Sequence, residues 1–367
     1  MALPSDAADP SPAGPLPAMG VVLVTYNAAD VILDSLEGLL ASPGVALTIA
    51  VVDNDSTDGT AQTIRDWAAG RTAYAPPEDL PFELAPAAKP LPLAPGAEAL
   101  GPVAAGAITT GGTRHRVMLI ETGVNSGFAG GVNRGLEELA KLPELDRFWI
   151  LNPDATVPPE TARAFATAPG GFSLMGGRVL YLETPDVIQI DGGTLRRRDG
   201  VTGNIHLFAS HRATPAPKVE DMAFITGASM VASRDFYEAT GPMAEDYFLY
   251  YEEVDWALRR GALPLAYCAQ GIVYHRGGTA IGSPTPGRPA SPFSLYFKHR
   301  ARMMFMRRHL PGSVMTGHLF TIAKAGQYLL KGFVPEVGAM LAGAFGLAPP
   351  AAIRRRLSPE ALRRIGR

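Results

Sequence analysis

The strongest chemical signal in the sequence is a run of five carboxylates within eleven residues, from Glu245 to Asp255. Aromatic residues interrupt the run, which argues against a solvated helix face, where such charges are usually inert. Clustered carboxylates raise one another's pKa, and a carboxylate with a raised pKa can accept a proton from a reacting group. The spacing therefore favours a general base in this segment.

Polar residues end four predicted strands, and these form a second signal. Ligands of open parallel sheets bind beyond the carboxyl ends of the strands. Any one such group is an ordinary turn or cap, but four in succession favour a ligand site. The four groups are Thr25-Tyr26-Asn27, Asp53-Asn54-Asp55, Asn125 and Asn152-Pro153-Asp154.

A glycine-rich segment, 125–135, follows one of these strands. Its glycines let backbone N–H groups approach a ligand, and the start of a following helix favours anions. The segment lacks the Gly-x-Gly-x-x-Gly dinucleotide fingerprint and the Gly-Lys-Ser/Thr of a phosphate-binding loop. By itself it is also compatible with an ordinary helix start.

Asp154 and His275 are the candidates for holding a metal. A carboxylate after a buried strand is well placed to hold a divalent cation against a diphosphate, because hard cations prefer oxygen ligands. Capping of the next helix is the alternative for Asp154. His275 follows an apolar strand, where a lone histidine is more often structural, and it gains weight only if it lies near Asp154.

The elements that must position these residues alternate between strand and helix. Strands are predicted at 19–25, 47–52, 116–121 and 148–151, and helices at 30–40, 60–69, 132–142 and 158–166. This order predicts an α/β fold with a mostly parallel sheet and crossover helices. Further along, the sequence predicts a core strand at 223–232, a helix from Glu252 and a strand at 265–274.

Three segments depart from this alternation. Residues 1–18 lack Lys and Arg and are rich in proline, which predicts a disordered tail rather than a signal peptide. Residues 71–113 hold eight prolines and are predicted to be an inserted, mostly irregular loop. Residues 276–292 are a second Gly/Pro-rich stretch, after which 293–367 is predicted to be a basic helical extension of the α/β domain at 19–285.

Composition narrows the class of protein. The chain has 367 residues, 47% of them hydrophobic, a single cysteine and a formal net charge of −2. These values exclude overall disorder, a disulfide scaffold and a cysteine-rich zinc module, and they give no sign of nucleic-acid binding. No stretch of 18 uninterrupted apolar residues occurs, so we expect a cytoplasmic protein that does not span a membrane.

The order of motifs resembles that of inverting glycosyltransferases of family 2, which have the GT-A fold, a Rossmann-like sheet flanked by helices. It looks closest to the bacterial rhamnosyltransferase and galactofuranosyltransferase branch. Seven motifs carry the resemblance over about 21–280: VVLVTYN (21–27), VVDNDSTDGT (51–60), NSGFAGGVNRG (125–135), WILNPDATV (149–157), GASMVASRDFYEATG (227–241), EDYFLYYEEVDWALR (245–259) and VYHRGG (273–278).

The resemblance implies a role for each matching position. Glu253 matches the catalytic base, where relatives often have Asp, with Asp246 and Glu252 as alternatives. Asp154 and His275 match the site of a divalent cation, Mg²⁺ or Mn²⁺, and Asn152 replaces the first carboxylate of the family's Asp-x-Asp motif. The positions that match the nucleotide-sugar pocket are Thr25, Tyr26, Asn27, Asp53, Asn54, Asn125, Gly127, Phe128 and Asn133.

The resemblance also implies a reaction and its partners. The expected function is metal-dependent, inverting hexosyl transfer from a nucleotide-sugar donor to a glycan or lipid-linked acceptor in cell-envelope polysaccharide synthesis. The donor is expected to be dTDP-rhamnose, with UDP-galactofuranose or another UDP-sugar next. Asp53-Asn54 could read uracil and thymine alike through their shared imide edge.

The C-terminal part of the chain is strongly basic. From Tyr296 onward it holds 13 Lys/Arg and two acids, a net charge of +11, whereas residues 1–295 carry −13. The stretch 293–310 mixes aromatic and Met residues with Lys and Arg, as helices that lie in anionic membrane interfaces do. Packing of the same helix on the α/β domain is the alternative. A peripheral location at the inner face of the cell membrane would suit a lipid-linked acceptor.

Three other classes remain open. A nucleotide-sugar-binding protein without catalysis is disfavoured by the 245–255 cluster and Asp154. A nicotinamide-dependent oxidoreductase is disfavoured by the missing fingerprint. A sugar-phosphate nucleotidyltransferase would carry a Gly-rich, basic loop after the first strand, where this chain has Thr25-Tyr26-Asn27-Ala28.

Overall fold

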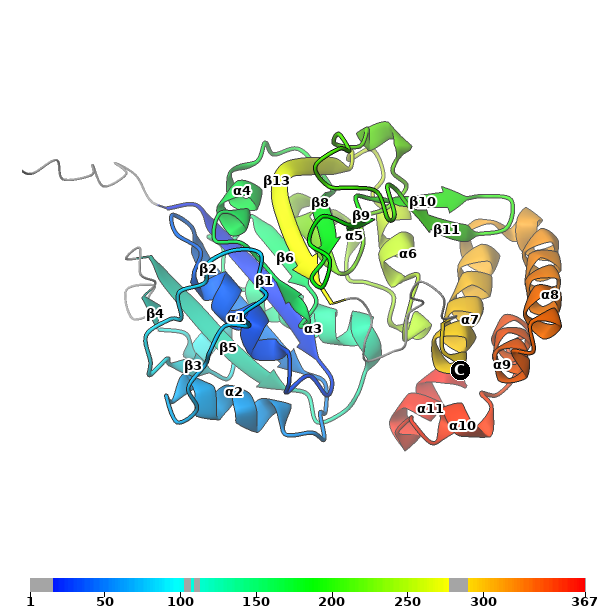
Figure 1. Ribbon diagram of the computed structural model, residues 1–367, viewed down its shortest axis with the longest axis horizontal. Helices are drawn as coiled ribbons and strands as arrows, with labels where there is room; N and C mark the ends of the chain where they lie inside the picture. The colour runs from blue at the N-terminus through cyan, green and yellow to red at the C-terminus, as the bar shows by residue number, and fades with distance from the viewer. Residues whose placement is uncertain (1–15, 102–106, 109–112, 277–289, 367) are drawn as a thin grey trace, which may run out of the picture.

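The computed structural model describes residues 16–101, 107–108, 113–276 and 290–366 (Figure 1). Most of the tail predicted at 1–18 lies outside these residues, as does most of the stretch 276–292. The strands are β1 (Ala18–Thr25), β2 (Ala46–Asp53), β3 (Leu93–Ala94), β4 (Ala107–Ile108), β5 (Arg114–Glu121), β6 (Arg147–Leu151), β7 (Ala155–Thr156), β8 (Leu174–Tyr181), β9 (Ile188–Ile190), β10 (Gly193–Arg196), β11 (Val201–Asn204), β12 (Ser229–Ser233) and β13 (Ala266–His275).

Within the described residues the main sheet has eleven strands, and its central order is β3-β5-β2-β1-β6-β12-β8-β13-β7. The strands β3, β5, β2, β1 and β6 run parallel, so their carboxyl ends meet at one edge. β12 is antiparallel to both of its neighbours, and β13 runs parallel to β8. The predicted α/β fold with a mostly parallel sheet is confirmed.

The helices are α1 (Ile32–Leu40), α2 (Thr60–Ala68), α3 (Gly127–Ala140), α4 (Thr161–Thr167), α5 (Arg234–Thr240), α6 (Glu252–Leu258), α7 (Pro292–His309), α8 (Val314–Leu330), α9 (Val334–Ala344), α10 (Ala351–Arg354) and α11 (Pro359–Ile365). Side chains of a strand alternate between its two faces. Met19, Val21 and Leu23 of β1 accordingly pack with α1, α2 and α4, whereas Val22 packs with α3.

The helix predicted at 132–142 begins earlier than expected, within the glycine-rich segment. Helix α3 begins at Gly127, five residues before the predicted start, so most of the glycines lie inside the helix. A Cβ on Gly131 would lie 2.4 Å from Val24 of β1. These glycines therefore let α3 approach the sheet closely, and this packing outweighs their low helix propensity.

The core strand predicted at 223–232 is also shorter than expected. Only Ser229–Ser233 forms a strand, β12. The preceding Phe224 and Ile225 are buried, but Phe224 bridges to Gly193 outside the main sheet. The apolar run is therefore core, as predicted, although half of it is irregular in backbone.

The inserted segment 71–113 is anchored by one buried carboxylate. Glu37 of α1 accepts hydrogen bonds of 2.7 Å from Trp67 Nε1, the Ala87 backbone N–H and Lys89 Nζ. Lys89 also lies over the Trp67 ring, 4.4 Å from its centre. The insertion then adds the short parallel strand β3 beside β5.

Replacing Glu37 by Ala is expected to lower the free energy of unfolding by about 3 kcal/mol, because it leaves a largely buried ammonium and an indole N–H without their acceptor. Chemical denaturation of the full chain measures this. Glu78→Ala, an exposed acid in the same insertion, is the matched control and should change stability by less than about 0.5 kcal/mol. Equal effects of both substitutions would contradict the anchoring role of Glu37.

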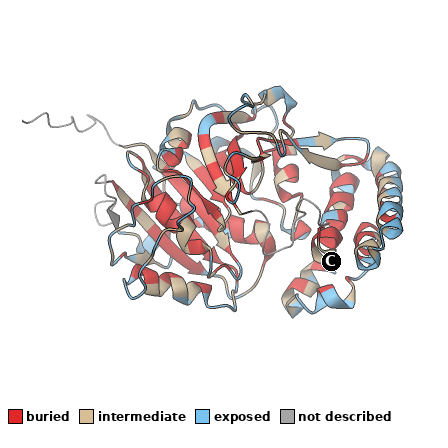
Figure 2. Cartoon of the chain, viewed as in Figure 1, coloured by how far each residue is buried: buried red, intermediate tan, exposed pale blue. Residues whose placement is uncertain are grey.

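The C-terminal helices form a layer beside the sheet domain, with α7 between that domain and the outer helices α8 and α9 (Figures 1 and 2). The predicted basic amphipathic helix at 293–310 is α7, and most of it is buried, although Lys298, Arg307 and Arg308 are exposed. Arg300 donates to the carbonyls of Asp246, Tyr247 and Ile365, and Arg302 donates to those of Asp199 and Gly317. The arginines of α7 hold the layer together, so α7 itself is not a membrane-binding surface.

Candidate active site

Asp154 and His275 lie together at the edge of the sheet, which is the condition that the sequence analysis set for His275. The turn after β6 leads into β7, and β7 pairs with the end of β13 at Ala155 and His275. This pairing places Asp154 Oδ1 3.0 Å from His275 Nε2. Asn152 Nδ2 lies 3.1 Å from the same ring nitrogen. All three candidates at this edge therefore converge on one atom.

Gln189 completes this group, and the sequence analysis missed it. Its Oε1 lies 2.7 Å from His275 Nδ1. With Nδ1–H donating to that oxygen, Nε2 is the ring nitrogen that faces Asp154 and Asn152, and a cation bound there would take the place of a proton on Nε2. The available signal was weak: Gln189 is the one polar residue of the short strand β9, between the buried Ile188 and Ile190.

The donor set at this edge fits a divalent cation. Burial alone would raise the pKa of the Asp154 carboxyl, but the His275 imidazole outweighs burial and holds that pKa below its ordinary value. An ionised carboxylate and an imidazole nitrogen 3.0 Å apart can share one cation. No three His, Cys, Asp or Glu side chains gather as a metal site in the described part of the chain, so water and a ligand's oxygens must supply the remaining positions.

The ends of β1 and β2 meet through side chains that were predicted to line a nucleotide pocket. Thr25 Oγ1 donates to Asp53 Oδ1 at 2.9 Å. Asn27 has a left-handed backbone, φ 54°, and its Oδ1 accepts from the Thr57 N–H. Tyr26 between them is exposed. The strand ends are thus fixed, and Tyr26 is left facing solvent.

Asn54 is committed to holding the start of α3. Its Oδ1 accepts from the Ser126 N–H at 3.1 Å, and its Nδ2 donates to the Gly127 carbonyl at 2.9 Å and to Asn125 Oδ1 at 3.3 Å. Asn125 Oδ1 also accepts from the Gly127 N–H. Asn54 and Asn125 therefore hold the start of α3, whereas the buried Asp53 accepts hydrogen bonds from Thr25 Oγ1 and the Ser56 N–H.

Asn133 and Phe128 connect α3 to the acidic segment. Asn133 Nδ2 donates to the Met243 carbonyl and to Glu245 Oε1, both at 3.0 Å, and its Oδ1 accepts from the Met243 N–H. The Phe128 N–H donates to the Phe248 carbonyl at 3.2 Å. Both residues were predicted to contact the donor, and the structure places both at the junction of α3 with 243–248.

Gly127 is the closest point of this junction. Its φ is +79°, and a Cβ there would lie 2.5 Å from the Phe248 carbonyl oxygen. We expect Gly127→Ala to lower the free energy of unfolding by about 2 kcal/mol, because the new side chain is strained and displaces 245–251. Thermal melting measures this, with Ala129→Gly on the same helix as a control for helix propensity. A Gly127→Ala variant of unchanged melting temperature would contradict the close contact.

The segment before α6 is held in an unusual backbone conformation. Phe248, Tyr250 and Tyr251 all have φ near +70°, a region that non-glycine residues rarely adopt. The surrounding fold holds them there: Tyr251 Oη donates to the Gly200 carbonyl at 2.6 Å, and Tyr250 Oη lies 2.7 Å from Ser294 Oγ of α7. Strain of this kind is retained where it positions a functional group, and the next residues are Glu252 and Glu253.

Three of the five carboxylates in the acidic run have structural partners. Glu245 accepts from Asn133 and from Arg364 of α11. Asp246 forms a 2.6 Å ion pair with Arg308 of α7. Asp255 is buried among Arg259, Arg308 and His309. Asp246, an alternative for the base, is therefore engaged in docking α7.

Glu252 and Glu253 are the other two carboxylates of the run, and their surroundings differ. Glu252 is buried, and neither carboxyl oxygen has a hydrogen-bond partner among the described residues. Burial, and then the charge of Glu253, raise its pKa well above the ordinary value. Burial also raises the pKa of Glu253, but backbone N–H groups and Lys298 oppose the rise. Burial therefore favours the protonated form of both carboxyls, most strongly at Glu252, and Lys298 favours ionisation of Glu253.

Lys298 of α7 faces this pair from the C-terminal layer. The side chain is exposed to solvent, although protein surrounds it closely enough to lower the pKa of its ammonium. Glu253 and Lys298 are close enough to interact electrostatically, and each favours the charged form of the other.

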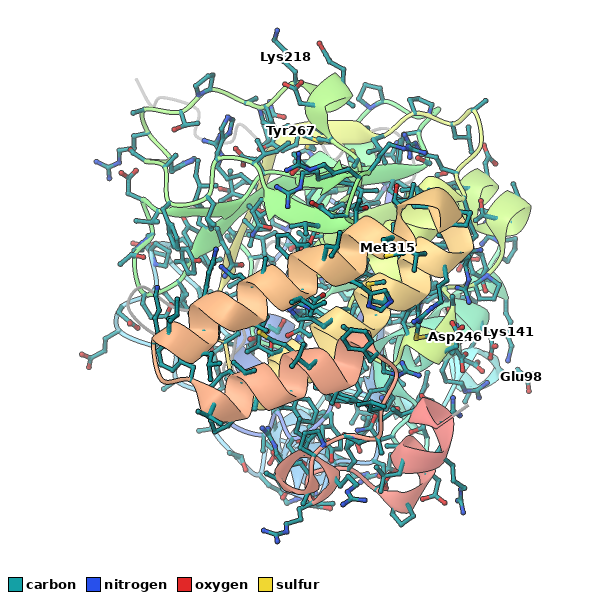
Figure 3. The ribbon with its side chains drawn as sticks, turned by 90° about the vertical axis from the view of Figure 1, so that its right-hand side faces the viewer. Glu98, Lys141, Lys218, Asp246, Tyr267 and Met315 are labelled. Carbon is teal, nitrogen blue, oxygen red and sulfur yellow. The ribbon has the colours of Figure 1, made fainter. Side chains whose placement is uncertain are left out.

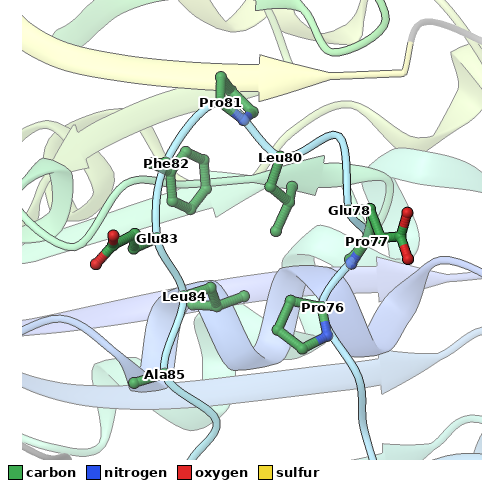
Figure 4. Close-up of a pocket in the computed structure, with 9 residues that line it drawn as sticks. All are labelled: Pro76, Pro77, Glu78, Leu80, Pro81, Phe82, Glu83, Leu84 and Ala85. Atoms are coloured by element: carbon green, nitrogen blue, oxygen red, sulfur yellow. The ribbon is translucent and has the colours of Figure 1, made fainter.

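A separate hollow lies in the insertion, away from these residues. It is formed by the loop 76–85 of the insertion, with Leu80, Phe82 and Leu84 inside the loop and its carboxylates, Glu78 and Glu83, pointing away (Figure 4). Phe82 stacks on Tyr274, 5.7 Å between ring centres. Because neighbouring residues of a strand point to opposite faces, this contact lies on the face of β13 opposite His275. The hollow has no cationic group for a diphosphate and is not the predicted site.

One part of the chain resembles a known family. Residues 20–78, which include most of β1, all of β2 and the Thr25–Asp53 pair, match the family model described as glycosyl transferase family 2. The rhamnosyltransferase-like branch stays a prediction.

One curated relative and two solved structures show how far the likeness extends. The chain is 30% identical over 146 residues to the low-salt glycan biosynthesis hexosyltransferase Agl10 of Haloferax volcanii, an alignment that spans 38% of this chain and 45% of the relative. The mannosyltransferase PcManGT of Pyrobaculum calidifontis, solved with GDP-Man and Mn²⁺, has a TM-score of 0.47 at 16% identity over 95% of this chain and 81% of its own. TarS of S. aureus has a TM-score of 0.44 at 12% identity over 79% and 39%.

Proposed function

We propose that the chain is a nucleotide-sugar-dependent glycosyltransferase. The observation that carries the proposal is the Asp154–His275 pair, held by Gln189 at the sheet edge of a chain whose residues 20–78 match the glycosyl transferase family 2 model. A sugar diphosphate is the ligand whose oxygens would complete a cation site there. Glu253, whose pKa is raised, could supply a base for transfer, which favours an enzyme over a protein that only binds nucleotide sugars.

Asp154 and His275 would hold the cation, Mg²⁺ or Mn²⁺, through Oδ1 and Nε2. Bound there, it would act as a Lewis acid on the diphosphate, whose negative charge grows as the sugar leaves. Gln189 keeps the His275 proton on Nδ1, and the side-chain amide of Asn152 lies beside the other ring nitrogen, Nε2. These residues would bind the cation and orient the His275 ring, and none of them would transfer a proton to the sugar.

Glu253 would accept the proton of the acceptor hydroxyl while that oxygen attacks the anomeric carbon from the face opposite the diphosphate. A single displacement of this kind inverts the configuration of the anomeric carbon. Lys298 lies close enough to favour the ionised form of Glu253. Glu252, protonated beside it, adds no second charge to repel the diphosphate.

The proposed donor is dTDP-rhamnose, and UDP-galactofuranose is the next candidate. Asp53 supports a pyrimidine donor, because its carboxylate can accept the single imide N–H that uracil and thymine share. Its oxygens already hold Thr25 Oγ1 and the Ser56 N–H, and each retains a free lone pair. The proposed acceptor is a glycan or a lipid-linked sugar at the inner face of the membrane, in cell-envelope polysaccharide synthesis.

A donor panel tests the proposal. Purified chain is incubated with dTDP-rhamnose, UDP-galactofuranose, other UDP-sugars and GDP-mannose, and nucleotide release is measured with Mn²⁺ and with EDTA. Release from a dTDP- or UDP-sugar that EDTA abolishes supports the proposal. Nucleotide binding without release from any donor would instead identify a binding protein, and release that EDTA leaves unchanged would remove the cation from the mechanism.

A further inference from the structure

Helix α8 is packed with its small residues inward. Its buried residues are Gly317, Thr321 and Ala325, spaced four apart on one face. A Cβ on Gly317 would lie 2.5 Å from Met306 Sδ of α7, so the helices approach closely there. Residues four apart lie on the same side of a helix, and this side of α8 packs on α7 and α9.

The large apolar residues of α8 face the opposite way. Met315, Leu319, Ile322, Leu329 and Leu330 have exposed fractions from 51% at Ile322 to 91% at Leu330. We call this set the outer face of α8. It lies on the outermost layer of the molecule, with Met315 near one end (Figure 3), and appears pale in the burial view (Figure 2). A surface helix of a water-soluble protein normally turns such residues to the core.

The C-terminal helices also carry cationic residues. Lys331 follows the face directly along the chain, and Arg354 of α10 and the next residue, Arg355, are exposed elsewhere among the C-terminal helices. From Val314 to the end the chain holds eight Lys/Arg and two acids. An apolar helix face with basic neighbours matches a bilayer interface that carries anionic headgroups.

We propose that the outer face of α8 inserts into the headgroup region of an anionic lipid bilayer, with the chain lying on the membrane. A second copy of the chain is the weaker occupant, because a symmetric pair through α8 would bring two strongly basic surfaces together. None of the helices in the described ranges is long and apolar enough to cross a membrane. The inference concerns binding only and does not depend on the proposed transfer reaction.

Vesicle flotation tests the proposal with the full chain and vesicles of phosphatidylcholine, with or without phosphatidylglycerol. Wild-type chain is expected to float with the anionic vesicles, and Leu319→Glu to reduce the bound fraction at least about tenfold. Gln327→Glu is the matched control: it adds the same charge at an exposed position on α8 at the rim of the outer face, and should bind nearly as wild type. Circular dichroism checks that both variants fold, and nucleotide release measures transfer separately.

Each outcome of the flotation experiment either supports the membrane proposal or contradicts it. Loss of binding in Leu319→Glu alone, with nucleotide release unchanged in solution, supports the proposal. It is overturned if the wild type does not float with anionic vesicles, or if both variants lose binding equally. A wild-type dimer that Leu319→Glu converts to monomer, without vesicle binding, would identify a second copy as the occupant and also overturn it. Failure of transfer with intact flotation would count against the proposed function alone.

Discussion

Glu253→Gln is expected to lower kcat for sugar transfer by about a thousandfold while leaving nucleotide binding unchanged. The amide keeps the size of the side chain but cannot accept the proton of the attacking hydroxyl. Transfer is measured as nucleotide release with acceptor present, and binding by calorimetry with the nucleoside diphosphate and Mn²⁺. Glu253→Asp, which keeps a carboxylate, should retain part of the activity and so separates loss of the base from loss of the fold.

Glu252→Gln is the matched comparison on the adjacent residue. Glu252 is held in its protonated form, and glutamine resembles a protonated carboxyl, so transfer should change little. Reversed results for the two substitutions would move the base to Glu252. The pH profile adds a second readout. Because the Glu253 pKa is raised, activity should fall as pH decreases through a value above the ordinary one for glutamate, and Glu253→Gln should abolish this dependence.

Asp154→Asn is the second substitution with a large expected effect. We expect the Mn²⁺-dependent part of nucleotide binding to disappear, because an amide oxygen is a far weaker partner for a divalent cation than the ionised carboxylate. Calorimetric titration of the nucleoside diphosphate with and without Mn²⁺ measures this directly. Gln189→Ala should cost about 10–100-fold in the same Mn²⁺-dependent affinity, since it releases the His275 ring from its fixed tautomer.

Asp221→Asn is the control, because Asp221 is an exposed carboxylate more than 50 positions from both Asp154 and His275 in the sequence. This substitution should leave the Mn²⁺-dependent affinity unchanged. The assignment of the cation site would be wrong if Asp154→Asn bound nucleotide with the same dependence on Mn²⁺ as wild type. Because the readout is affinity, the test does not require the acceptor to be known.

The sequence predicted the sheet edge well, because parallel strands bring their carboxyl ends to one side whatever the details of the loops. The alternation of apolar runs and helical spacing located β1, β2, β5 and β6 to within two residues at either end. The meeting of Asp154 with His275 could be stated only as a condition. It depends on the pairing of β7 with β13, which joins residues more than a hundred positions apart.

Other features could not be obtained from local patterns. Gln189 sits in a three-residue strand with no motif around it. The 293–310 stretch has the composition of an interfacial helix, and only the surrounding fold shows that its arginines bond to carbonyls in the interior. The glycines of α3 resemble a loop until the β1 side chains beneath them are known. In each case a partner distant in sequence decides the structure.

Helix α7 connects Glu253 to helix α8 and so fixes the distance between them. On one side its Arg300 and Arg308 hold the segment that leads to Glu253, and on the other it carries α8. With the outer face of α8 on a lipid surface, α7 would hold Glu253 at one fixed distance from that surface. A lipid-linked acceptor would then react only if its hydroxyl projects from the membrane by that distance. The proposed arrangement therefore selects acceptors by their length.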